Sequence, residues 1–344
     1  MIYPPKPRPG DRVAVVSPSR GLPEIFPEVY ELGLRRLRDE LGLEPVEYPS
    51  TRVMGSTPQD RARDLHAAFA DPEVTAVLAT IGGDDQITVL RHLDVDLIRA
   101  NPKPFFGYSD NTNLLHFLWT QGIVGYHGGS VMVHLGRGGR MHPAHLESLR
   151  AALFGSDWYH LAEPPDWGDE PVSFQTPDRF GEEPPMWPHE AWDWVNPPSG
   201  VLEGRTWGGN LEILSWLLQA GWVGPSETYA GCVLVLETSE EMPPDTEVYR
   251  ILRNLGERGL LGGCSGVVMG RPKAWEFDRP NPPEEKRRYV DAQRAAVERA
   301  MTEYAAGVPI VFGVDLGHTD PQLIVPYGGE IRLDGPNRRI EVHY

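Results

Sequence analysis

Apolar positions in the first part of the chain follow two different periods. Short apolar runs rich in β-branched residues predict strands, and segments with apolar residues every three or four positions predict amphipathic helices. The predicted strands are DRVAVVSPS, EPVEYP, VTAVLATIGG and KPFFGYS. The predicted helices are FPEVYELGLRRLRDELG, TPQDRARDLHAAFADP with Thr57 as N-cap, ITVLRHL, and a segment from about Asn111. Strands that alternate with helices predict a parallel sheet covered on both faces.

The periodic pattern is lost between Asp157 and Ser199. This segment holds five of the chain's ten tryptophans and nine of its 34 prolines. A loop of this length inside a compact protein is typically functional or disordered, and disordered segments are poor in aromatic residues. We interpret it as a connector that also folds over a site. The alternative, that its tryptophans only fasten it to the body, is equally open.

From Gly200 the chain becomes rich in strands again, with two helices predicted around Thr246 to Gly259 and Glu284 to Ala306. The sequence DGPNRR predicts a hairpin between the last two strands. The fold class is therefore α/β. We expect an N-terminal parallel sheet flanked by helices, of Rossmann or flavodoxin type, over 1–156, the connector over 157–199, and a smaller mixed α/β domain over 200–344.

The composition excludes several classes of binding partner. The net charge of −17 over 344 residues argues against a nucleic-acid or anionic-membrane surface, since both need clustered Lys and Arg. No apolar run approaches the ~20 residues that span a bilayer. Cys232 and Cys264 lie in apolar sequence, which favours buried free thiols, and no Cys/His spacing indicates a zinc site. We expect a cytoplasmic protein without a metal.

Three separate segments supply the residue types of a hydrolytic triad. A hydroxyl nucleophile needs a base, and the base needs an acceptor that orients it. Ser109 stands between a predicted strand and a predicted helix, Glu237 ends the run CVLVLE, and His318 follows a glycine in VFGVDLGHTDP. Their order matches that of α/β-hydrolases, but Asn111 stands where the GxSxG motif of those enzymes requires a glycine.

Each of these residues also has a purely structural interpretation. Ser109 and Asp110 are typical N-cap residues, and Glu237 could be a solvated carboxylate at a strand end. The double glycine of TIGGDD lets backbone amides approach an anion or an oxyanion closely. It could instead bind a nucleotide phosphate, although the GxGxxG pattern and the Walker lysine are missing.

Taken together, these segments resemble the LD-carboxypeptidase family of serine peptidases, which includes the microcin C self-immunity proteins. The similar pieces occur in the family's order: PGDRVAVVSPS, ATIGGDD, NPKPFFGYSDNTNLLHFL, GRTWGGNLEIL, LVLETSEE and GVDLGHTDPQLIVPYG. The resemblance implies a catalytic triad of Ser109, Glu237 and His318 and an oxyanion hole formed by the amides of Gly83 and Asp110. It also implies two α/β domains with the site between them, a homodimer, and no cofactor.

Three features are similar to the microcin-immunity branch: the residues around the double glycine, the sequence GHTDP around His318, and the long Trp-rich segment. Typical LD-carboxypeptidases have an arginine before the double glycine and a tyrosine after it, where this chain has Ile81 and Asp84. In the microcin-immunity branch an aromatic residue of a loop stacks on the nucleotide of the substrate. The resemblance therefore implies a peptidyl- or aminoacyl-nucleotide substrate, with Trp187, Trp192 and Trp194 as candidates for the stacking residue.

The expected function is hydrolysis of an amide bond through an acyl-enzyme. The first alternative is a muramoyltetrapeptide LD-carboxypeptidase that removes D-Ala from cell-wall peptides. The second belongs to another class, a non-enzymatic protein that binds a nucleotide-like ligand in the cleft between the domains. An α/β-hydrolase esterase is disfavoured by Asn111 and by the two-domain layout.

Overall fold

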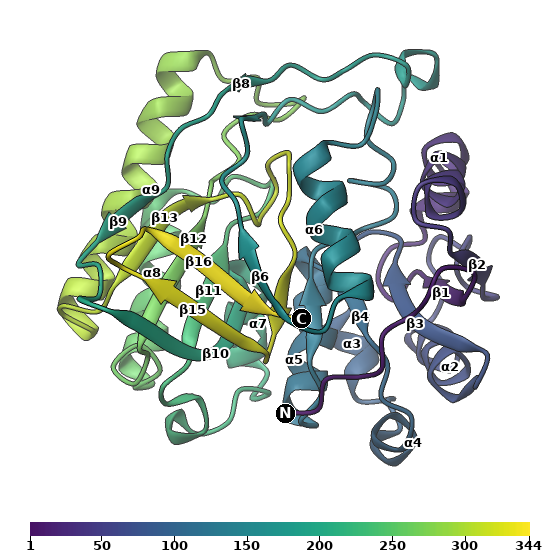
Figure 1. Cartoon of the computed structure of the whole chain (residues 1–344), viewed down its shortest axis with the longest axis horizontal. Coiled ribbons are helices and arrows are strands. Elements are labelled where there is room, and N and C mark those ends of the chain that lie inside the picture. Colours follow the sequence, from purple (N-terminus) through teal and green to yellow (C-terminus); the bar gives the residue numbers. More distant parts are fainter.

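The computed structural model describes the whole chain, residues 1–344, as two β-sheets with helices packed around them (Figure 1). The strands of the first sheet, in spatial order, are β14 (Val325–Tyr327), β5 (Gly125–His127), β4 (Phe105–Gly107), β3 (Val74–Ala79), β1 (Arg12–Val16) and β2 (Glu44–Glu47). All neighbours pair in parallel except β14, which runs antiparallel to β5. The predicted parallel N-terminal sheet is confirmed.

The second sheet is mixed. Its strands, in spatial order, are β6 (Trp158–Leu161), β16 (Arg339–His343), β15 (Glu330–Asp334), β10 (Val201–Asn210), β11 (Val233–Glu237), β12 (Gly266–Gly270), β13 (Ile310–Val314) and β9 (Asp193–Val195). Strands β10 to β13 are parallel, and the flanking strands are antiparallel. The predicted mixed α/β arrangement of the second half is confirmed. A separate pair is formed by β7 (Asp166–Trp167) and β8 (Trp187–Pro188).

Nine α-helices connect and cover the strands (Figure 1). They are α1 (Pro27–Asp39), α2 (Pro58–Ala70), α3 (Ile87–Leu90), α4 (Val95–Ala100), α5 (Thr112–Thr120), α6 (Pro143–Phe154), α7 (Leu211–Gln219), α8 (Asp245–Glu257) and α9 (Pro283–Tyr304). Single 3₁₀ turns occur at Leu22–Glu24, Ser109–Asn111, Pro177–Arg179 and Ser226–Tyr229. Helix α2 begins as predicted, because the Thr57 side chain accepts a hydrogen bond from the Asp60 amide.

The run RVAVV shows why the first sheet is buried on both faces. Successive side chains of a strand point to opposite faces, so Val13 and Val15 join one hydrophobic cluster while Ala14 and Val16 join the other. The first cluster includes Val29 and Leu34 of α1, and the second includes Leu65 of α2. Both clusters continue into the second sheet, so the two sheets share their cores.

Strands from distant parts of the sequence also pair with one another and join the two halves of the chain. Strand β14 comes late in the sequence but pairs with β5 of the first sheet. Strands β6 and β9 belong to the segment between Asp157 and Ser199, yet they form the two edges of the second sheet. No helix is long and apolar enough to cross a membrane. Both cysteines are free and buried.

Candidate active site

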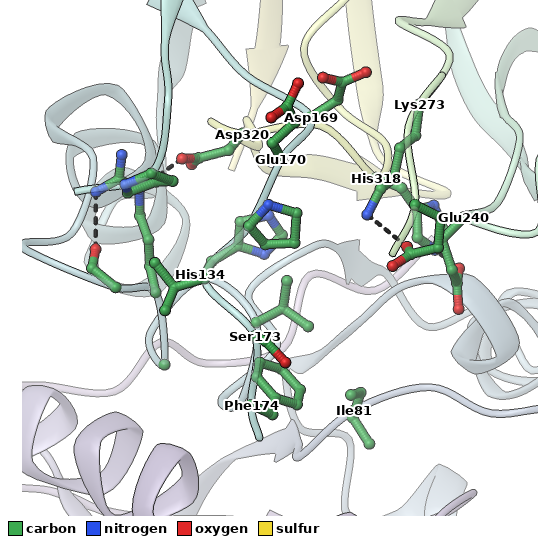
Figure 2. Close-up of a pocket in the computed structure, with 18 of the residues that line it drawn as sticks. Ile81, His134, Asp169, Glu170, Ser173, Phe174, Glu240, Lys273, His318 and Asp320 are labelled. Atoms are coloured by element: carbon green, nitrogen blue, oxygen red, sulfur yellow. Dashed lines mark hydrogen bonds and ion pairs between the residues drawn. The ribbon is translucent and has the colours of Figure 1, made fainter. Parts of the chain in front are cut away.

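A cavity of about 410 Å³ is lined by residues from both sheets and from the segment 157–199. Gly83 and Ser109 come from the loops that follow β3 and β4 of the first sheet, and His318 comes from the loop that follows β13 of the second. In Figure 2, His318, Glu240 and Lys273 lie together on one side of the cavity, and Phe174 and Ile81 lie on another. Cavities of this size accommodate small organic ligands.

Ser109 occupies a sharp turn between β4 and α5. Its φ angle is +60°, in the left-handed region that a non-glycine residue adopts at a cost. This turn presents the hydroxyl to the cavity, and Ser109 Oγ makes no hydrogen bond within the chain. Gly82 passes close by, because a Cβ atom on it would lie 3.0 Å from Cβ of Ser109. The missing side chain at Gly82 thus allows the two loops to approach each other.

Glu237 and His318 form a buried pair. Nδ1 of His318 lies 2.6 Å from Oε2 of Glu237, whose side chain is 1% exposed. Gly317 makes this contact possible, because a Cβ atom there would lie 3.0 Å from Cβ of Glu237. The other oxygen of Glu237, Oε1, has no hydrogen-bond partner. The contact with Glu237 therefore uses Nδ1 of His318 and not Nε2.

A second carboxylate reaches His318 from the other side. Nε2 of His318 lies 3.0 Å from Oε2 of Glu240, a residue of the turn that follows β11. Burial lowers the pKa of His318, but the two carboxylates outweigh it and raise the pKa to about 10. For Glu240, the partial loss of solvent inside the cavity raises the pKa, but the contact with His318 outweighs this effect and lowers the pKa to about 2. While both carboxylates contact it, His318 is therefore protonated at neutral pH.

Asp110 directly follows Ser109 in the turn, and Gly83 follows Gly82 in the loop that lies against this turn. The Gly83 amide makes no hydrogen bond within the chain and borders the cavity. The Asp110 carboxylate is buried and accepts hydrogen bonds from the amides of Asp85 (3.1 Å) and Gln86 (2.9 Å). Burial raises the pKa of Asp110, although the hydrogen bond from Ser19 opposes it. Asp110 thereby holds the loop after Gly83 against the turn that carries Ser109.

The three tryptophans considered for substrate stacking do not line the cavity. Trp192 is buried and donates from Nε1 to Asp315 at 2.9 Å. Trp194 is buried in β9, opposite Val311. Trp187 lies beside Trp167, with their ring centroids 5.9 Å apart. Any of the three would have to leave these contacts in order to touch a ligand in the cavity.

Sequence reasoning missed several residues of the cavity wall. Phe174 comes from the same Trp-rich segment and packs edge-to-face on Phe26, with centroids 5.7 Å apart. Arg20 and Lys273 follow the carboxyl ends of the parallel strands β1 and β12. Ligands in α/β sheets bind beyond these ends, so this rule, applied to every strand, would have found both. Glu240 stands only three residues after Glu237.

The sequence matches one family over most of its length. Residues 13–128 match the N-terminal domain of LD-carboxypeptidases, and residues 203–333 match their C-terminal domain.

Three relatives illustrate the range of this similarity. A putative carboxypeptidase of Streptomyces coelicolor is 31% identical over 347 residues, covering 97% of this chain and 94% of the relative. The microcin C7 self-immunity protein of Escherichia coli is 27% identical over 293 residues, with coverages of 83% and 78%. The murein tetrapeptide carboxypeptidase of Pseudomonas aeruginosa is 27% identical over 340 residues, with coverages of 95% and 94%.

Solved structures show the same fold. The microcin C7 self-immunity protein in complex with aspartyl sulfamoyl adenosine superposes with a TM-score of 0.84 at 23% identity, covering 100% of this chain and 99% of the other. A microcin-immunity-like protein from Streptococcus pneumoniae in complex with AMP gives a TM-score of 0.84 at 25% identity, with coverages of 97% and 99%. The two-domain α/β fold is therefore shared.

Proposed function

The chain belongs to the LD-carboxypeptidase family of serine peptidases, and we propose that it hydrolyses an amide bond through an acyl-enzyme formed on Ser109. The observation that carries this proposal is the contact between His318 and Glu237 at 2.6 Å on the cavity that Ser109 lines. A nucleophile, a base and an orienting carboxylate are the parts that such a reaction needs.

In the proposed first step, neutral His318 takes the proton of Ser109 on Nε2 while Oγ attacks the carbonyl carbon. Glu237 accepts the hydrogen bond from Nδ1, which keeps the proton on that nitrogen and stabilises the imidazolium that forms. The imidazolium then gives its proton to the leaving nitrogen, and the C–N bond breaks. Water, deprotonated by His318, releases the acyl group from Ser109 in the same way.

The proposed oxyanion hole consists of the amides of Gly83 and Asp110. The free amide of Gly83 at the cavity and the proximity of the Asp110 amide to Gly82 support it. The N-terminus of α5 adds a favourable dipole for negative charge beside Ser109.

Replacing Gly83 with alanine tests this oxyanion hole. A Cβ atom on Gly83 would lie 2.2 Å from Oγ of Ser19, so the loop must shift and carry the amide away. We expect kcat to fall by about 100- to 1,000-fold, the usual effect of losing one such donor. The matched control is Gly55→Ala, because Gly55 also has a positive φ but its Cβ would meet nothing within 4 Å. Equal activity of the two variants would remove Gly83 from the oxyanion hole.

For the substrate we propose a peptidyl- or aminoacyl-nucleotide. The cavity wall formed by Phe26 and Phe174 supports this, because an aromatic face can stack on a base. The similar protein from E. coli is a microcin C7 self-immunity protein, and a structure of such a protein holds aspartyl sulfamoyl adenosine. Because one of the relatives is a murein tetrapeptide carboxypeptidase, a cell-wall tetrapeptide is the alternative substrate. Comparing kcat/KM on aspartyl-sulfamoyl adenosine and on a murein tetrapeptide decides between the two.

Phe174→Ala tests the stacking residue. Stacking of a base on an aromatic side chain contributes about 1–3 kcal/mol, so KM for aspartyl-sulfamoyl adenosine should rise by roughly five- to 150-fold. The control is Phe180→Ala in the same segment, because Phe180 is also half-buried but lies outside this cavity. Trp187→Ala is the rival variant. If it raises KM while Phe174→Ala does not, the segment must rearrange to bring Trp187 to the base.

We also propose that the protein acts as a homodimer in the cytoplasm. Two buried cysteines that remain free thiols agree with a reducing compartment, and the family resemblance implies the dimer. Light scattering of the purified protein measures the oligomeric state, and a mass near the 38.4 kDa of one chain would contradict the dimer.

A further inference from the structure

The nitrogen of His318 that catalysis requires is engaged by Glu240. Nε2 is the atom that must accept the proton of Ser109, and it lies 3.0 Å from Oε2 of Glu240. Glu240 is not needed to orient the imidazole, because Glu237 already contacts Nδ1. The proposed mechanism gives Glu240 no role, so its position has to be explained in another way.

Glu240 differs from the other carboxylates that line the cavity. Each of those four contacts a Lys or Arg side chain. Asp169 and Glu170 pair with Lys286, Glu276 with Lys273, and Asp320 with Arg137. Glu240 contacts only His318. Lys273 attracts it electrostatically, but the Lys273 ammonium is paired with Glu276 at 2.9 Å. Glu240 is thus the one cavity carboxylate that a cationic ligand can engage without displacing a lysine or an arginine.

Glu240 is also placed to move. It lies on the turn between β11 and α8, and its side chain is 49% exposed, whereas that of Glu237 is 1% exposed. The backbone of this turn is held independently of the side chain, because the guanidinium of Arg279 donates to the carbonyls of Glu241 and Met242. Rotation of the Glu240 side chain therefore leaves the fold intact.

We propose that Glu240 binds a positively charged ammonium group on the acyl part of the substrate, and that this binding draws Glu240 away from His318. The inference rests on the proposed function and specifies its substrate class, namely aminoacyl compounds with a free α-ammonium. One carbon atom separates that nitrogen from the carbonyl carbon that Ser109 attacks. A carboxylate in contact with the general base is therefore within reach of the ammonium.

When Glu240 leaves His318 for the ammonium group, His318 loses a negative neighbour, and this change makes it a base. The groups that face His318 are Glu237 and Glu240, the ring of Tyr108 with its centroid 4.8 Å away, and, at longer range, His127 and His134. While Glu240 is in contact, the imidazole holds its proton, with a pKa of about 10. When an ammonium engages Glu240, that attraction weakens, the proton passes from Nε2 to solvent, and His318 becomes the neutral base.

The first test measures the hydrolysis of two substrates by the full chain. These are aspartyl-sulfamoyl adenosine and its N-acetyl derivative, which lacks the positive charge. We expect wild type to prefer the free amine by at least about tenfold in kcat/KM, as for the loss of a charged hydrogen bond. Glu240→Gln should abolish this preference, chiefly through KM for the free amine. The matched control Glu241→Gln, at the next and exposed position, should keep it.

The second test uses pH. The kcat/KM of wild type on the N-acetyl derivative, which has no ammonium group to titrate, reports the free enzyme, and it should rise with pH toward the pKa of about 10, because only neutral His318 accepts a proton. In Glu240→Gln one attracting carboxylate is gone, the pKa of His318 falls, and the rise moves to lower pH. The kcat of wild type on the free amine should also rise at lower pH than kcat/KM does.

A third measurement separates this inference from the proposed substrate. A serine-directed phosphonate needs neutral His318 but no amine, so at pH 7 it should label Glu240→Gln faster than wild type. If wild type cleaves neither adenosine substrate but shows this difference, the proposed substrate is wrong and the contact between Glu240 and His318 still restrains the base. Equal labelling rates, or a Glu240→Gln variant that retains the preference for the free amine, would overturn the inference.

Discussion

Replacing Ser109 with alanine is expected to lower the kcat for amide hydrolysis by about 10⁶-fold. Losing the nucleophile of a comparable triad has an effect of this order, because the remaining groups only bind the substrate and polarise it. Alanine tolerates the +60° φ angle of position 109 no worse than serine does, so the fold should be retained. Turnover of aspartyl-sulfamoyl adenosine by the variant and by wild type gives the ratio.

The same variant separates an enzyme from a binding protein. A serine-directed phosphonate should add one phosphonyl group to wild type and none to Ser109→Ala, as measured by intact mass. Ser156→Ala, at an exposed position outside the cavity, should be labelled like wild type. If wild type binds the nucleotide but neither cleaves it nor takes the label, the protein is a non-enzymatic binder and the triad proposal is wrong.

Much of the fold could be predicted because its long elements carry clear periods. The run RVAVV is a continuous apolar run that is buried on both faces of the sheet, the helix after Phe26 buries helically spaced side chains, and both form where predicted. Strands β6 and β9, which form the two edges of the second sheet, have only four and three residues. A strand this short shows too little alternation of period two to be recognised, and the two edge strands within the segment 157–199 therefore cannot be predicted from its residues.

The pairing of β14 with β5 could not be predicted from the sequence, for a different reason. The sequence VPY reads as a strand, but a strand's partner depends on which edge remains free after the rest has folded. Strand β5 leaves such an edge in the first sheet, and β14 occupies it after the chain has completed β13 of the second sheet. This crossing connects the two halves of the chain beside the site.

The sequence allows single residues of the candidate site to be predicted, but not that they border the same cavity. Ser109 follows β4 in one sheet, whereas Glu237 ends β11 and His318 follows β13 in the other. The rule that ligands bind beyond the carboxyl ends of strands applies within each sheet. It does not state that the carboxyl ends of two sheets border one cavity. Glu240 was missed because its position matters only through Nε2 of His318, a contact between residues 78 positions apart in sequence.

Glu237→Gln is the second variant with a large expected effect, a fall in kcat of about 10⁴-fold. The amide has nearly the shape of the carboxylate, so the side chain still fits beneath Gly317 and Gly270. It carries no charge to stabilise the imidazolium, however, and its NH₂ group favours the wrong tautomer of His318. Steady-state kinetics at saturating aspartyl-sulfamoyl adenosine measures the fall.

Glu212→Gln is the matched control for this variant, because it also replaces a buried carboxylate near the site. Glu212 accepts two hydrogen bonds from Ser239 and does not line the cavity. Burial raises the pKa of Glu212 to about 7, so a substantial fraction of this carboxyl is already neutral at pH 7. We therefore expect Glu212→Gln to alter stability more than kcat. If both variants lose the same activity, Glu237 acts on the local fold and not on the charge of His318, and the orienting role assigned to it is wrong.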